Sequence, residues 1–88
     1  MAWRVELDER AIKDLRRLDR PVAQLILRYL HERVAAAEDP RQFGKALTGN
    51  MRGLWRYRVG DYRLVCRLEE DRLLVLVVAV GHRSQIYR

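Results

Sequence analysis

The sequence predicts an α+β fold, in which an N-terminal strand and a helical hairpin pack on a small, mostly antiparallel four-stranded sheet. Apolar residues recur at helical spacing in the first half of the chain. The second half contains three extended runs, and a glycine-containing two-residue turn joins the first two. We expect residues 1–88 to form one domain, because a chain of this length builds a single modest core.

The first half of the chain has the pattern of a strand followed by two helices. Residues 3–7 alternate between apolar and polar side chains, which indicates a short strand. Asp8 can cap a helix over residues 9–18. Pro21 fits only the first turn of a second helix, which should end before Asp39. The apolar stripe of this helix has i, i+3, i+4, i+7 spacing and comprises Val22, Leu25, Ile26, Tyr29, Leu30, Val34 and Ala37.

The second half has the pattern of three strands, over residues 54–59, 62–68 and 72–80. Gly60 and Asp61 join the first two as a hairpin, in which glycine supplies the positive φ of a type II′ turn. The third strand is apolar at almost every position. We therefore expect it to be central and covered on both faces.

The tight turn fixes how the strands of this hairpin pair. Arg58 falls opposite Arg63 and Arg56 opposite Val65, so these side chains and Arg67 share one face. Directly opposed like charges destabilise a sheet by up to ~1 kcal/mol, which points to a phosphate site rather than to stability. A bulge before the third strand would reverse its alternation. Without one, the third strand adds Leu73, Val75, Val77, Ala79, Gly81 and Arg83 to this face.

Each candidate residue also has a purely structural explanation. Arginines on an exposed sheet face are usually just solvated. His82 is by itself more often structural than catalytic, although imidazole is the commonest general acid or base. Tyr87 would by default pack its ring as an anchor. The sequence pattern alone leaves these alternatives open.

The charge of the chain favours a polyanionic partner. Its 18 Lys and Arg residues oppose 12 Asp and Glu residues, for a net charge of +6. Residues 49–88 hold 8 of the cations but only 4 of the anions, so most of the excess lies in the strand-rich half. Nucleic acid or an acidic protein would suit this balance.

Other classes of protein are disfavoured by the sequence. The longest apolar run, residues 73–80, is far short of the ~20 residues that a membrane-spanning helix needs. The first residues contain no apolar signal region. The single cysteine, Cys66, excludes an internal disulfide and forms no metal-binding motif with the two histidines. We expect a cytoplasmic protein without membrane contact, cofactor or metal.

Three segments occur in an order that resembles the RelE/ParE toxin superfamily. They are KALTG at residues 45–49, LWRYRVGDYRLV at residues 54–65 and VGHRSQIY at residues 80–87. The resemblance implies the toxin of a type II toxin–antitoxin system, with a cognate small antitoxin of the RelB kind as its partner. Contact with operator DNA would come only through the antitoxin.

RelE-like members of the superfamily bind the ribosomal A site and cut mRNA there without metal, leaving a 2′,3′-cyclic phosphate. The resemblance therefore implies an endoribonuclease that inhibits translation. The family's basic and tyrosine positions match Arg56, Arg58, Arg63, Arg83 and Tyr87. The best-known members have lysines at the first two positions, and arginine essentially cannot release a proton. A general-base role for those two arginines is therefore not expected.

The implied roles follow from attack of a ribose 2′-OH on the adjacent phosphorus. Tyr87 would be the base, and Arg63 with Arg56 would hold the phosphate oxygens. Arg58 would assist, and Arg83 would stabilise or protonate the leaving 5′-oxygen. His82 is a weaker alternative acid or base.

Two other functions remain open. ParE-like members share the fold and inhibit DNA gyrase without nuclease activity. An inactive relative would persist as an antitoxin-bound co-repressor at operator DNA.

Overall fold

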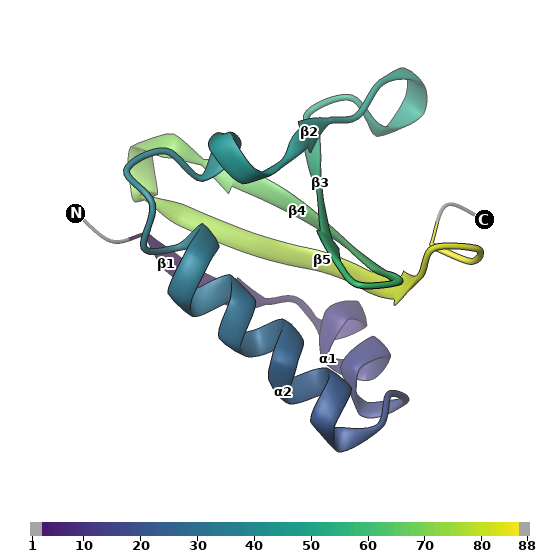
Figure 1. Ribbon diagram of the computed structural model, residues 1–88. Coiled ribbons are helices and arrows are strands. Elements are labelled where there is room, and N and C mark those ends of the chain that lie inside the picture. The colour runs from purple at the N-terminus through teal and green to yellow at the C-terminus, as the bar shows by residue number, and fades with distance from the viewer. Residues whose placement is uncertain (1–2, 87–88) are drawn as a thin grey trace.

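The computed structural model describes residues 3–86, which form one five-stranded sheet with both α-helices on the same face (Figure 1). The strand order is β1-β5-β4-β3-β2, and only β1 and β5 pair in parallel. The α+β class is confirmed, but the sheet has five strands rather than four. The strands are β1 (Arg4–Leu7), β2 (Lys45–Ala46), β3 (Leu54–Val59), β4 (Tyr62–Glu69) and β5 (Leu74–His82), and the helices are α1 (Glu9–Arg16) and α2 (Arg20–Tyr29).

The strand missing from the prediction is β2. Its two residues pair with β3, Lys45 opposite Arg56 and Ala46 opposite Trp55. Two residues are too few for an alternating pattern to emerge from the sequence. The pairing instead depends on the preceding segment, which returns the chain to the edge of β3.

Both helices begin where the sequence predicts. The Asp8 carboxylate accepts a hydrogen bond of 2.9 Å from the Ala11 N–H and caps α1. Pro21 lies in the first turn of α2, which continues into a π-helical turn at Leu30–Val34 and ends before residue 38. Leu25 is 52% exposed, so its assignment to the buried stripe is wrong.

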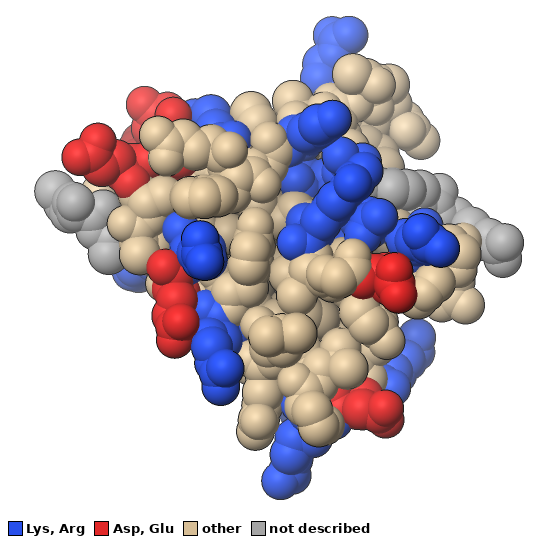
Figure 2. Space-filling view, viewed as in Figure 1, with Lys and Arg blue, Asp and Glu red and all other residues tan. Residues whose placement is uncertain are grey.

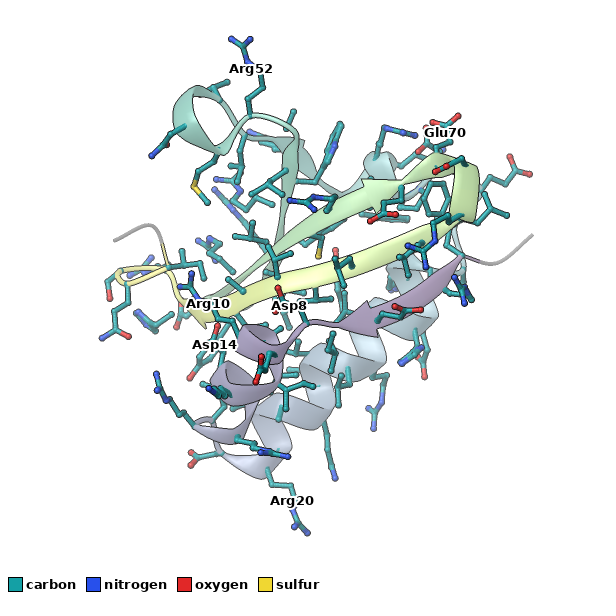
Figure 3. All side chains as sticks on the ribbon, turned by 180° about the vertical axis from the view of Figure 1, so that it is seen from behind. Asp8, Arg10, Asp14, Arg20, Arg52 and Glu70 are labelled. Atoms are coloured by element: carbon teal, nitrogen blue, oxygen red, sulfur yellow. The ribbon has the colours of Figure 1, made fainter. Side chains whose placement is uncertain are left out.

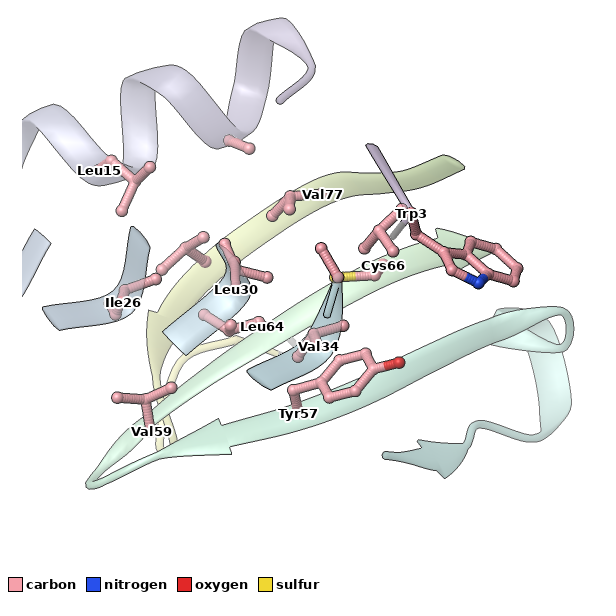
Figure 4. Close-up of a cluster of buried hydrophobic side chains, with 14 residues drawn as sticks. Trp3, Leu15, Ile26, Leu30, Val34, Tyr57, Val59, Leu64, Cys66 and Val77 are labelled. Carbon is pink, nitrogen blue, oxygen red and sulfur yellow. The ribbon is translucent and has the colours of Figure 1, made fainter. Parts of the chain in front are cut away.

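The main core lies between the helices and the sheet (Figure 4). Burying such side chains contributes roughly 25 cal/mol per Å² of apolar surface and is the main stabilising term. The cluster joins both helices to β3, β4 and β5, which explains why the helices cover only this face. Its fully buried members are Ala11, Ile26, Leu30, Val34, Tyr57, Leu64, Cys66, Val75 and Val77.

The hairpin between β3 and β4 has the predicted register. Gly60 has a φ of 58°, as a type II′ turn requires at this position. Arg58 lies opposite Arg63, and Arg56 lies opposite Val65. The alternation along both strands is therefore confirmed.

The predicted alternation along β5 is wrong in part, because the strand contains a bulge at its centre. Val65 pairs with Ala79, whereas the next residue, Cys66, pairs with Val77. Val78 is thus the extra residue, and it shifts the side-chain alternation by one position. The sequence suggested that a bulge could reverse the alternation at the turn before the strand, but the bulge lies in the middle of the strand.

On the two sides of the bulge, different residues of β5 face the helices. Gly81 lies opposite Arg63, on the predicted face. Val75 and Val77 instead turn toward the helices and are fully buried in the main core. Leu73 precedes the strand with a φ of 47° and also packs against that core. A strand buried on both faces gives an even apolar pattern, so the sequence does not reveal which residue is inserted.

A side chain from α1 completes the hydrogen bonding at the end of β5. The neighbouring strand β1 ends with Leu7 opposite Val77. Beyond that point, the Asp14 carboxylate accepts a 2.9 Å hydrogen bond from the Val80 N–H (Figure 3). Arg10 lies 3.7 Å from the same carboxylate oxygen. Asp14 thereby satisfies a strand donor that would otherwise lack a partner.

The segment before β2 is fixed against the side chain of Tyr57. The buried Tyr57 hydroxyl donates a 2.9 Å hydrogen bond to the Pro40 carbonyl oxygen. Gly44 follows, and a Cβ atom there would lie 2.9 Å from the tyrosine ring and 3.1 Å from the Arg56 carbonyl oxygen. The absence of a side chain at Gly44 therefore lets the chain approach β3 closely.

Arg41 holds the same segment to the turn between β4 and β5. Its guanidinium bonds Asp39 at 2.9 Å and Glu70 at 2.7 Å. These bonds raise the pKa of Arg41. The guanidinium carbon also lies 6.0 Å from the centre of the Trp55 ring. The contacts with Glu70 and Trp55 thus fix residues 39–44 relative to the sheet.

Replacing Gly44 by alanine should destabilise the fold, because the added methyl group meets the Tyr57 ring and the β3 backbone. Overpacking of this kind typically costs about 1–3 kcal/mol. Urea unfolding of Gly44→Ala measures the loss. Thr48→Ala, in an exposed part of the same connection, should change stability by less than about 0.5 kcal/mol. Equal stability of the two variants would contradict the close approach.

Candidate active site

The candidate site is the sheet face that points away from the helices. We call it the arginine face and define it by Arg56, Arg58 and Arg63, with Arg83 at its edge. In the space-filling view, Lys and Arg side chains gather over β3 and toward the C-terminal end of the chain (Figure 2). The hairpin register places the first three side chains on this face.

No acidic side chain among residues 3–86 neutralises these arginines. The ion pairs that the structure describes all involve other cations, namely Arg4, Arg10, Arg41 and Arg72. Arg58 and Arg63 lie directly across the β3–β4 ladder from each other. Such a pair is unfavourable in the free protein and becomes favourable when an anion lies between the charges.

Arg56 carries an unsatisfied hydrogen-bond donor. Its Nε atom is buried and has no partner among the described residues. Buried polar groups in native proteins nearly always have partners, so this unpartnered Nε atom is unusual. A phosphate oxygen has the charge and the lone pairs for this position.

Arg63 is partly committed to the turn. Its Nη1 atom donates to the carbonyl oxygens of Gly60 and Tyr62, each at 3.1 Å. A guanidinium has five N–H donors, so the rest of the group remains available to a ligand. Arg63 therefore supports the hairpin in addition to any role on the arginine face.

A hollow of about 280 Å³ lies beside Arg56 and Arg58. Its lining residues are Gln42, Phe43, Gly44, Lys45, Arg56 and Arg58. Sequence reasoning did not identify Lys45 as a site residue, because the pairing of β2 with β3 was not predicted. That pairing puts Lys45 opposite Arg56 and adds a third cation to the hollow. The signal in the sequence was the KALTG segment, which contains this lysine.

Arg83 follows directly after β5. Its N–H donates a 2.8 Å hydrogen bond to the Asp61 carbonyl oxygen, which ties the residue to the hairpin turn. Its side chain is exposed, and the residue lies two positions beyond Gly81, which is on the arginine face. The structure thus brings Arg83 to the same end of the sheet as Arg63.

His82 lies on the other face of the sheet. It pairs with Tyr62, and the two rings meet edge to face with their centres 5.9 Å apart. Its Nδ1 atom lies 2.9 Å from the Ser84 hydroxyl. His82 also lines a second hollow of about 330 Å³ together with Arg10 and Arg17. The His82 side chain therefore points away from the arginine face, and the hollow that it lines extends to Gly81 and Ile86 at the end of the strand.

The chain end folds back over a second, smaller apolar cluster. Ile86 is 5% exposed and packs with Val65 and Ala79. The Ile86 N–H donates to the His82 carbonyl oxygen at 3.1 Å. A Cβ atom at Gly81 would lie 3.3 Å from the Ile86 side chain, so glycine makes room for it. Tyr87, the candidate base, lies outside the described residues.

Other nucleophiles and ligands in the described part of the chain are ill suited to catalysis. Burial raises the pKa of the Cys66 thiol far above neutrality, so the reactive thiolate is disfavoured. Burial likewise raises the pKa of Tyr57. Residues 3–86 contain no cluster of three His, Cys, Asp or Glu side chains that would hold a metal ion.

The fold and the arginine face define a small α+β protein with a basic, carboxylate-poor sheet. The family model described as "ParE toxin of type II toxin-antitoxin system, parDE" matches residues 5–87. The chain is 32% identical to "mRNA interferase toxin RelE" of Escherichia coli, over 99% of this chain and 92% of that protein. It is 27% identical to "Toxin RelG" of Mycobacterium tuberculosis, over 100% and 99%. The chain therefore belongs to the RelE/ParE superfamily of toxins from type II toxin–antitoxin systems.

Solved structures share the architecture. The toxin–antitoxin complex RelBE2 from Mycobacterium tuberculosis matches with a TM-score of 0.87 at 24% identity, over 97% of this chain and 95% of that chain. At that identity, the likeness shows only the fold. A variant of the Escherichia coli toxin RelE in the free state matches with a TM-score of 0.76 at 31% identity, over 99% and 92%. No helix within residues 3–86 is long and apolar enough to cross a membrane.

The arginine face should weaken the fold that carries it. Replacing Arg58 by threonine removes the repulsion with Arg63 and should raise the free energy of unfolding by up to ~1 kcal/mol relative to Arg67→Thr. Arg67 is the matched control, because it lies on the same hairpin opposite Leu54 rather than opposite a cation. The difference should shrink at high salt, where the repulsion is screened. Urea unfolding at two salt concentrations measures both effects, and a less stable Arg58→Thr would contradict the repulsion.

Proposed function

We propose that this toxin is a ribosome-dependent endoribonuclease that cuts mRNA in the A site and so inhibits translation. The observation that carries the proposal is the arginine face, where the opposed arginines have no acidic partner among residues 3–86 and the Arg56 Nε atom has no protein acceptor. The Escherichia coli relative named an mRNA interferase toxin supports it at 32% identity. Arginine-rich surfaces of this kind bind phosphate bidentately.

The reaction would be an internal transesterification. The 2′-oxygen of a ribose forms a bond to the adjacent phosphorus, and the bond from phosphorus to the 5′-oxygen breaks. The products are a 2′,3′-cyclic phosphate and a 5′-hydroxyl. A base takes the 2′-proton, and the leaving oxygen gains a proton. Negative charge grows on the phosphate oxygens in the transition state, where preorganised cations stabilise it most.

The residues of the arginine face divide these tasks. Arg56 and Arg63 would bind the nonbridging oxygens, with Arg58 and Lys45 adding positive charge beside them. Arg83 would stabilise the leaving 5′-oxygen, since it lies at the end of β5 next to the hairpin turn.

The proton acceptor proposed for the 2′-OH is Tyr87. A phenol beside guanidinium groups would have a lowered pKa, because the positive charges favour its ionised form. The His82 imidazole, by contrast, lies on the opposite face of the sheet. The ribosome would align the mRNA for attack, which is the step that a bound geometry accelerates most.

Inhibition of DNA gyrase is the second candidate function, because the matching family model is that of ParE toxins. Under this alternative, the purified protein blocks supercoiling by gyrase and leaves mRNA on programmed ribosomes intact. Pulse labelling after induction separates the two functions in cells. Loss of protein synthesis supports the endoribonuclease, whereas a DNA-damage response supports the gyrase toxin.

Single-turnover cleavage of mRNA on programmed ribosomes tests the proposed roles. Tyr87→Phe should slow cleavage by about 10²–10⁴-fold, the usual contribution of a general base. Arg56→Ala should slow it by about 10²–10³-fold, as expected for a lost charge-stabilising donor. Arg67→Ala changes the end of the hairpin away from the turn, and His82→Ala changes the opposite face. Both variants should stay close to the wild-type rate.

The opposite ranking would reject this assignment. Cleavage at the wild-type rate by Tyr87→Phe would make the tyrosine an anchor rather than a base. A large loss in His82→Ala with an intact melting temperature would move the acid–base chemistry to the other face. Wild-type protein that leaves mRNA uncut on the ribosome would reject the function itself.

We also propose that a small antitoxin of the RelB kind binds this toxin. The structural neighbours include toxin–antitoxin complexes from Mycobacterium tuberculosis and Escherichia coli. Co-expression with the protein encoded by an adjacent short acidic reading frame should restore growth and give one complex on size exclusion. Separate elution of the two proteins at micromolar concentration would contradict the partnership.

A further inference from the structure

The one phenylalanine of the chain, Phe43, is exposed beside the arginine face. Its side chain is 42% exposed, while most other large apolar side chains of residues 3–86 are covered. Two other large apolar side chains, Ile12 and Leu25, are also exposed, but both are aliphatic and lie on the helices. Phe43 instead lines the hollow formed with Lys45, Arg56 and Arg58.

The backbone that carries Phe43 is firmly held. Phe43 ends a short 3₁₀ turn that begins at Pro40. The Tyr57 hydroxyl binds the Pro40 carbonyl oxygen, and Gly44 packs against the tyrosine ring. Arg41, inside the turn, bonds both Asp39 and Glu70. An exposed aromatic ring on an anchored turn loses little conformational freedom when it binds a ligand.

The residues around the Phe43 ring indicate which kind of ligand the hollow would bind. Lys45 and Arg56 are paired residues of neighbouring strands, so two cations face the hollow next to the ring. No acidic side chain lines it, and Gln42 adds an amide that can both donate and accept hydrogen bonds. A planar apolar surface beside phosphate-binding cations suits an unpaired nucleotide, whose base stacks while its phosphate pairs with the cations.

We propose that Phe43 is a stacking platform for an unpaired nucleobase, and that Lys45, Arg56 and Arg58 hold the phosphate next to that base. The subsite rests on RNA being the substrate of the proposed function. It assigns Phe43 to the base of the nucleotide beside the cleaved bond, while the arginines that line the hollow hold the phosphate of that bond. Stacking is sequence-tolerant, so the platform fixes the position of the strand rather than reading one base.

A short RNA that cannot be cut tests the subsite apart from cleavage. The probe is a fluorescein-labelled single-stranded pentamer with 2′-O-methyl riboses, compared with the same pentamer lacking its central base. Fluorescence anisotropy at fixed salt gives Kd for each pair, since salt alone changes such affinities strongly. The variants are Phe43→Leu, which keeps an apolar side chain without a π-face, and Phe43→Tyr, which keeps the ring.

The expected pattern depends on both the ring and the base. Phe43→Leu should weaken binding of the complete pentamer by about 5- to 100-fold, the usual effect of losing one stacked base. Phe43→Tyr should bind like the wild type. Removing the base should weaken wild-type binding by a similar factor and leave Phe43→Leu unaffected. A melting temperature of Phe43→Leu near that of the wild type shows that the fold is intact.

Several outcomes would overturn the subsite. One is that wild type and Phe43→Leu bind the complete pentamer with equal affinity. Another is that Phe43→Leu weakens binding of both pentamers by the same factor. The third is that the wild type binds neither pentamer at millimolar RNA. Loss of antitoxin binding without loss of RNA binding would assign Phe43 to a protein partner instead. Because this assay needs no cleavage, base-dependent binding by a protein that leaves ribosomal mRNA uncut would keep the subsite and reject the endoribonuclease.

Discussion

The two-residue turn at Gly60 and Asp61 sets the register on which both faces of the sheet depend. With two residues in the turn, Val59 pairs with Tyr62, and each pair along the ladder follows from that one. Side chains alternate with a period of two, so a slip of one residue would exchange the faces. The core face would then carry arginines, and Tyr57 would lose its place beneath the helices.

The register puts the apolar core on one face of the sheet and the opposed arginines on the other. On the inner side, Tyr57, Leu64 and Cys66 are fully buried in the core, and burial of such apolar surface stabilises the fold. On the outer side, Arg58 and Arg63 face each other without an acidic partner among the described residues. The core tolerates the repulsion because burial outweighs a term of ~1 kcal/mol.

The end of β5 is held from both faces. On the helix side, the Asp14 carboxylate binds the Val80 N–H. On the arginine side, Ile86 packs over Val65 and next to Gly81. These contacts fix the strand from which Arg83 projects. Proposed catalysis therefore depends on a strand end that the aliphatic side chain of Ile86 helps to anchor.

The sequence by itself determined the helix cap at Asp8, the hairpin turn at Gly60 and the pairing of Arg58 with Arg63. Each depends on residues close together in the chain, where capping, turn geometry and alternation act directly. The catalytic assignments of the arginines came from the family resemblance and remain proposals.

Only the tertiary structure decided the features that join distant segments. The bulge at Val78 lies in a strand that is apolar throughout, so no pattern marked the inserted residue. Lys45 reached the arginine face because Tyr57 and Arg41 hold its segment against the sheet. Contacts made across the chain depend on packing in three dimensions, which neighbouring residues do not encode.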